Sequence, residues 1–116
     1  MNDGIFNKTG TGAISFTNDQ DIDGTASMTM GGNITISAGR TVTYKNTSAG
    51  GIVLSGILDG GSATSTWVNG TNATVYYQST ASANRPMNTG RLDVSAAGNN
   101  FYYSRAGAQT LKTPLS

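Results

Sequence analysis

The chain has 116 residues, the size of a single domain, and a formal net charge of +1, since 7 Lys and Arg stand against 6 acidic residues, all Asp. Charged residues make up only 11% of the chain, whereas Gly, Thr, Ser and Asn together provide 56 of the 116 residues. Helix-favouring residues are scarce and no basic excess is present to neutralise phosphates. The composition therefore argues against a helical protein and against a nucleic-acid partner bound through counterion release.

Cys and His are both absent, so the chain cannot build a disulfide, a zinc site with Cys or His ligands, a thiol nucleophile or a Ser–His pair. No apolar run exceeds three residues, and we therefore expect no membrane insertion. The first residues have neither the basic nor the apolar region of a secretory signal peptide. We expect a protein made without such a signal, or a piece of a longer one.

Short stretches in which an apolar residue alternates with Thr, Ser or Asn follow one another along the chain. This period of two predicts strands with one buried face. The predicted strands are, in chain order, residues 13–17, 27–30, 33–37, 41–45, 51–55, 74–78, 91–95, 100–104 and 109–112. The alternation predicts a core made of Ile14, Phe16, Ile34, Ile36, Val42, Tyr44, Ile52, Leu54, Val75, Tyr77, Leu92, Val94, Phe101 and Tyr103.

Gly-rich turns separate these strands and leave no room for helices, which predicts an all-β protein. Residues 36–44 align with residues 94–103 if one residue is inserted, and residues 72–77 form a partial third copy. Such imperfect repeats favour a parallel β-solenoid, like a right-handed β-helix, of about five short coils at roughly 20 to 25 residues each. A β-sandwich is the alternative.

We expect residues 1–116 to form one module. Residues 78–90 contain the pair Arg85–Pro86 and no clean alternation, so they are predicted to leave the stack as a loop. No polar capping element is recognisable at either end of the predicted solenoid. Since each coil is stabilised by its neighbours, we expect the ends to be covered by flanking coils or by further copies of the chain.

The run of residues 33–44 resembles coils of parallel right-handed β-helices in bacterial surface proteins. Residues 65–77 and 100–112 are similar to repeats of large, adhesin-like Bacteroidetes cell-surface proteins, in which a TWxNGxNxTVxY segment precedes a VxYxxxGxQTLK segment. The resemblance implies an extracellular, structural or adhesive module. Those proteins usually end in a sorting domain, which is not recognisable here, so a phage virion protein, such as a fibre or a capsid decoration subunit, is the alternative.

Asp19, Asp21 and Asp23 occupy alternate positions before Gly24, as in the first half of a calcium-binding loop, where carboxylate oxygens converge on one cation. The twelfth position of such a loop, normally Glu, is Met30. The alternative is a strand or turn that exposes the three carboxylates and points Ile22 inward. Calcium is the only cofactor that the sequence suggests.

Trp67, Tyr76 and Tyr102 fall outside the predicted core and are expected to face solvent, where a ring with a polar tip can contact a partner or a surface glycan. No phosphate-binding loop or nucleophile elbow is present, and no Lys or Arg shares a motif with the acids. The sequence therefore predicts a protein that is not an enzyme. A glycan-binding module is a third functional alternative.

Overall fold

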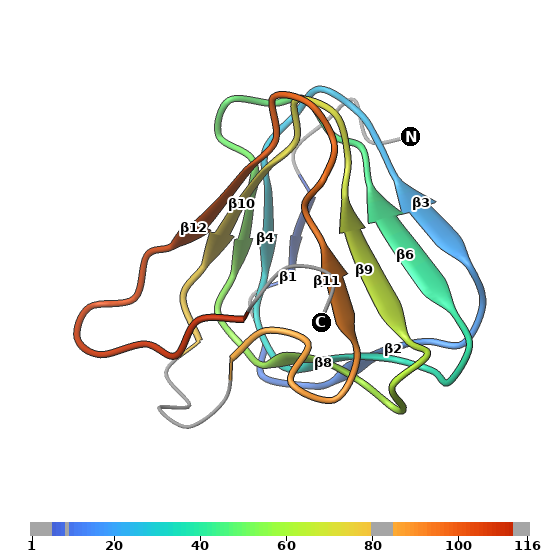
Figure 1. Cartoon of the computed structure of the whole chain (residues 1–116). Coiled ribbons are helices and arrows are strands. Elements are labelled where there is room, and N and C mark those ends of the chain that lie inside the picture. The colour runs from blue at the N-terminus through green and yellow to red at the C-terminus, as the bar shows by residue number, and fades with distance from the viewer. Residues whose placement is uncertain (1–5, 9, 80–84, 113–116) are drawn as a thin grey trace.

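A computed structural model describes residues 6–8, 10–79 and 85–112, which contain strands and turns but no helix (Figure 1). The strands form three sheets. Sheet 1 consists of β1 (Phe6–Lys8), β4 (Met28–Met30), β7 (Ile52–Leu54), β10 (Thr74–Tyr77) and β12 (Asn100–Tyr103). Sheet 2 consists of β3 (Gln20–Ile22), β6 (Thr41–Tyr44), β9 (Thr66–Asn69) and β11 (Arg91–Asp93). Sheet 3 consists of β2 (Ile14–Phe16), β5 (Ile34–Ile36) and β8 (Leu58–Gly60).

Consecutive strands belong to different sheets, and all pairs within a sheet are parallel. The chain therefore winds through about four turns of a β-solenoid, and β12 starts another. In Figure 1 each sheet runs through the colours in chain order, because every turn stacks on the one before it. The predicted parallel β-solenoid is confirmed, with about four turns where we expected about five coils. No helix that could cross a membrane occurs among the described residues.

The in-register pairing stacks equivalent residues of successive turns into columns that run along the solenoid. Sheet 1 has two inward columns. The first consists of Met28, Ile52, Val75 and Phe101, and the second consists of Met30, Leu54, Tyr77 and Tyr103. The main inward column of sheet 2 is Val42, Trp67, Leu92. Stacking like residues on like residues gives one continuous apolar core along the axis.

Every predicted core residue lies in this core or packs against it. Those in the middle turns are fully buried, at 2% relative exposure or less: Ile34, Ile36, Val42, Tyr44, Ile52, Leu54, Val75, Tyr77 and Leu92. The others are partly buried and pack against these: Ile14, Phe16, Val94, Phe101 and Tyr103. The core also contains residues that alternation did not assign, among them Met28, Met30, Leu58, Trp67 and Met87.

The observed strands differ from the predicted ones in two ways: four were not predicted, and one predicted strand does not form. Strands β1, β3, β8 and β9 were not among the predicted ranges, although a strand or turn was the alternative for the segment that contains β3. Residues 109–112 form no strand. Their polar side chains bind backbone instead: Gln109 Nε2 donates to the carbonyl oxygen of Tyr77 at 2.9 Å, and Lys112 Nζ donates to that of Gly90 at 3.1 Å. Alternation over four residues therefore does not distinguish a strand from a segment whose side chains bind the backbone of other turns.

The predicted loop at residues 78–90 includes residues 80–84, which lie outside the described residues. Its described parts form no strand, as expected, but they do not leave the stack. Met87 is fully buried, and its backbone N–H donates to the carbonyl oxygen of Leu58 at 2.7 Å. Asp59 of β8 also accepts hydrogen bonds from the backbone and hydroxyl of Thr89. The segment thus takes the place that a fourth strand of sheet 3 would occupy.

Buried asparagines shape the turns that lead from sheet 2 to sheet 1. Asn46 Nδ2 donates to the carbonyl oxygen of Ala26 at 2.7 Å, and its Oδ1 accepts from the backbone of Ser48. Asn69 Nδ2 donates to Asn99 Oδ1 and to the carbonyl oxygen of Asn100, both at 3.1 Å. Both asparagines are fully buried, and they bind backbone groups where the strands end.

Candidate functional site

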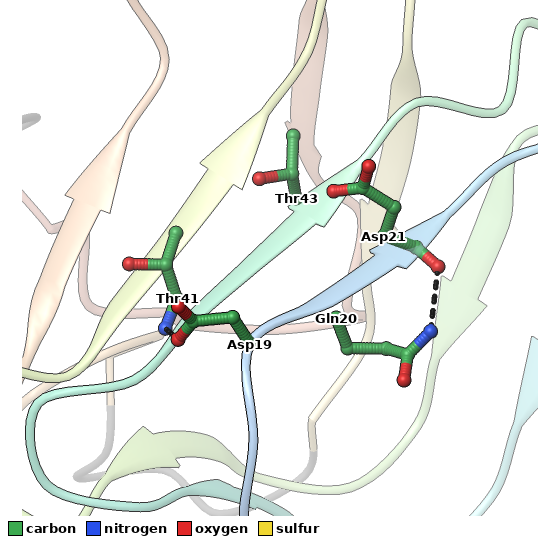
Figure 2. A pocket seen from close by; sticks show the side chains of 5 residues that line it. All are labelled: Asp19, Gln20, Asp21, Thr41 and Thr43. Carbon is green, nitrogen blue, oxygen red and sulfur yellow. Dashed lines mark hydrogen bonds between the residues drawn. The ribbon is translucent and has the colours of Figure 1, made fainter.

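Asp19 and Asp21 lie on the outer face of sheet 2 and line a shallow surface pocket with Gln20, Thr41 and Thr43 (Figure 2). The Asp19 carboxylate accepts a hydrogen bond from the backbone N–H of Thr41 at 2.9 Å. The Asp21 carboxylate forms an ion pair with Lys45 Nζ at 2.6 Å, with both side chains about half exposed. The acidic side chains therefore connect the first turn to the second.

The strand alternative for this acidic segment is the one observed, because Gln20–Ile22 form β3 and Ile22 is partly buried against the core. In the part of the chain that the structure describes, no three acidic side chains are grouped as metal ligands. Asp19 and Asp21 instead bind a backbone amide and a lysine. Calcium binding at Asp19, Asp21 and Asp23 stays a prediction.

Trp67, expected at the surface, is fully buried at 0% relative exposure, and its assignment as a surface contact is wrong. On β9 the alternation turns Trp67 and Asn69 inward, so the indole stacks on Val42 and is followed by Leu92. Its ring also lies 6.1 Å from that of Tyr44, at an interplanar angle of 20°. The Tyr44 hydroxyl is buried as well, and this burial raises the pKa of Tyr44 above its ordinary value.

Tyr76 and Tyr102 lie side by side on the outer face of sheet 1, as expected from the sequence. They are partners in the register of β10 and β12, and their ring centroids are 5.1 Å apart at an interplanar angle of 15°. Tyr76 is partly buried, whereas Tyr102 is 47% exposed. The structure therefore brings together two of the three aromatic residues proposed for surface contacts.

The same register extends this pair into what we call the tyrosine column: Thr29, Val53, Tyr76 and Tyr102. Two positions further along each strand lies a second outward column, which we call the polar column: Ser55, Gln78 and Ser104. Its backbone N–H groups continue the ladder by donating to Met30, Leu54 and Tyr77. The sequence alone did not identify the polar column, because these residues become neighbours only through the alignment of successive turns.

Lys112 is a charged side chain buried to 7% relative exposure. Its ammonium donates to the carbonyl oxygen of Gly90, and its backbone N–H donates to the hydroxyl of Tyr103 at 2.9 Å. Loss of hydration lowers the pKa of Lys112 from its ordinary value. Both contacts fasten the segment after β12 to the last turns, so we assign Lys112 a structural role.

Asp93, on the outer face of β11, supports a prediction on pH dependence. The hydroxyl and the backbone N–H of Ser95 donate to its carboxylate at 2.7 and 2.9 Å, and these bonds hold the pKa of Asp93 below its ordinary value. Because the folded-state pKa is depressed, the stabilisation is present above the unfolded-state pKa and is lost as the pH falls through the folded-state value.

We expect the Ser95→Ala variant to raise the pKa of Asp93 towards its ordinary value, since the hydroxyl donor is removed while the backbone donor stays. An NMR titration of the Asp93 side-chain carboxyl measures it. The Ser55→Ala variant is the control, because Ser55 is an exposed serine on another sheet. An unchanged Asp93 pKa in Ser95→Ala contradicts the assignment.

Comparison of the chain with protein-family models, with curated proteins and with solved structures finds no match.

Proposed function

We propose that this chain is a non-catalytic, structural β-solenoid module of a bacterial surface protein or fibre, which works by joining further turns at its ends. One observation carries the proposal: the inward-pointing side chains are fully buried in the middle turns and only partly buried at both ends. Ile36, Val42 and Ile52 are fully buried, whereas Ile14 at one end and Phe101 at the other are only partly buried.

The terminal strands have the same incompleteness in their backbones. Strands β1, β2 and β3 at one end and β8, β11 and β12 at the other each pair with one strand only within the described residues. An edge strand presents unpaired N–H and C=O groups, which form a template for another strand. In a solenoid an added turn would also complete the apolar columns, so backbone pairing and burial favour the same partner.

The two ends are not equivalent, which corrects the expectation that neither end has a polar cap. Residues 104–112 cross the last turns, and Gln109 and Lys112 bind the carbonyl oxygens of Tyr77 and Gly90. The cover is partial, because Leu111 is 63% exposed. The first turn, with Ile14, Phe16 and Ile22 partly exposed, is therefore the end at which we propose that another strand or turn packs.

The proposal predicts that the purified 116-residue chain self-associates with increasing concentration in sedimentation velocity. The Ile14→Lys variant is expected to reduce association, because an inward-pointing charge on a terminal strand opposes pairing. Lysine can extend its ammonium to solvent at this partly exposed position, so the fold should persist.

The matched control is Thr35→Lys, an exposed position on the outer face of β5, the strand beside β2, where we expect unchanged association. Circular dichroism verifies that each variant is folded. A parent chain that stays a monomer at all accessible concentrations and melts cooperatively contradicts the proposal. Equal loss of association in both variants contradicts the placement of the contact at the first turn.

A further inference from the structure

The outer face of sheet 1 combines two kinds of side chain in adjacent columns. The tyrosine column supplies stacked rings on β10 and β12, and the polar column supplies the exposed hydroxyls and amide of Ser55, Gln78 and Ser104. A hydroxyl and a primary amide each offer both a donor and an acceptor. The two stacked rings thus lie directly beside a row of neutral hydrogen-bonding groups.

Tyr102 has the more accessible ring of the pair. One face of the ring stacks on Tyr76, which belongs to the preceding turn. Because β12 is the terminal strand of sheet 1 in the described residues, no strand lies beside the opposite face, and Tyr102 is 47% exposed. Tyr76 supports the covered face of the Tyr102 ring, since Tyr76 is itself partly buried between its neighbours in the column.

Neither column contains a charged residue, in contrast to the outer face of sheet 2. There Asp21, Lys45, Arg91 and Asp93 lie at outward positions. A ligand that covers the outer face of sheet 1 therefore buries no unpaired charge of the protein. An anionic or cationic ligand finds no opposite charge in either column. This neutrality selects for an uncharged polar partner.

We propose that this strip, centred on Tyr102 and Gln78, binds a neutral saccharide. A pyranose has an apolar face of C–H groups and a rim of hydroxyls, and these match a ring that lies beside amide and hydroxyl groups. The hot spot of a protein–protein interface is typically a side chain enclosed in a desolvated pocket, which these exposed side chains do not offer. The saccharide site does not depend on the end-to-end joining proposed above.

The test is a calorimetric titration of the full chain with cellohexaose and with mannohexaose, and with hexagalacturonate as the anionic counterpart. We expect measurable affinity for at least one neutral hexasaccharide and weaker affinity for the anionic one. The Tyr102→Leu variant should weaken binding about tenfold, because it keeps apolar area but loses the ring. The Gln78→Ala variant should weaken it as well.

The control is Thr35→Ala, on the outer face of sheet 3, which should leave affinity unchanged. Melting curves should be similar for all variants, because Tyr102 and Gln78 are exposed. Failure of both neutral hexasaccharides to bind at millimolar concentration overturns the proposal, as does Tyr102→Leu with unchanged affinity.

Sedimentation separates this outcome from that of the end-joining proposal. If Tyr102→Leu reduces self-association but no hexasaccharide binds, the strip is a contact between copies of the chain and the saccharide proposal is wrong. If saccharide binds and the parent chain is a monomer, the saccharide proposal stands and the end-joining proposal fails.

Discussion

The Trp67→Ala variant is expected to lose about 3–5 kcal/mol of unfolding free energy, the usual cost of removing a large buried aromatic side chain from a core. Trp67 is 0% exposed and occupies the middle of a column, with Val42 in the turn before and Leu92 in the turn after. Its removal leaves a cavity between these turns and takes the stacking partner from Tyr44. Urea unfolding followed by circular dichroism measures the loss.

The matched comparison is Tyr102→Ala, which removes an aromatic side chain of similar size from the outer face of sheet 1. Since Tyr102 is 47% exposed, its truncation should cost well under half as much, about 1 kcal/mol. Equal losses in the two variants contradict the burial of Trp67. A wild-type-like Trp67→Ala variant contradicts the register of β9 in sheet 2.

Within a strand, alternation was enough to orient side chains. Val75 and Tyr77 flank Tyr76, so the inward and outward faces of β10 follow from the sequence, and the outward position of Tyr76 was predicted correctly. Ile34 and Ile36 on β5 are equally clear, because Thr35 between them is exposed. The physical basis is local: a strand has a period of two wherever one face is buried.

What the sequence could not supply was the alignment of one turn with the next. Trp67 was placed outside because its inward position depends on pairing with Val42, 25 residues earlier in the chain. The aligned repeats at residues 36–44 and 94–103 also lie at different corners, since the first connects β5 to β6 and the second connects β11 to β12. Similar corners recur in a solenoid, and local similarity does not identify which corner is meant.

The candidate surface strip depended on this missing alignment too. Gln78 and Ser104 become neighbours only because Tyr77 and Tyr103 pair across β10 and β12. Met87 was missed for a related reason, since it follows Pro86 in a segment without alternation, yet it fills the core beside Leu58. Columns that cross turns are therefore a property of the fold rather than of any local pattern.

Close stacking of the turns predicts that the Gly56→Ala variant is strongly destabilised. A Cβ atom at Gly56 would overlap the carbonyl group of Gly32 in the preceding turn and would lie 2.8 Å from the backbone nitrogen of Asn33. Both obstacles are backbone, so the strain cannot be relieved by rotating a side chain. The two turns must separate, which stretches the bond from Ile34 N to the carbonyl oxygen of Ile57, now 2.7 Å.

We expect Gly56→Ala to cost about 3 kcal/mol, at the upper end of the usual range for overpacking, because the clash is with backbone. Gly61, on the other side of β8, is the matched control. A Cβ atom there meets its nearest neighbour, the backbone nitrogen of Ala38, at an ordinary 3.5 Å. Gly61→Ala should therefore be neutral or slightly stabilising, since alanine restricts the unfolded chain more than glycine does. Urea unfolding of the two variants in parallel measures the contrast, and equal midpoints would show that the turns before and after β8 are not stacked as closely as the structure places them.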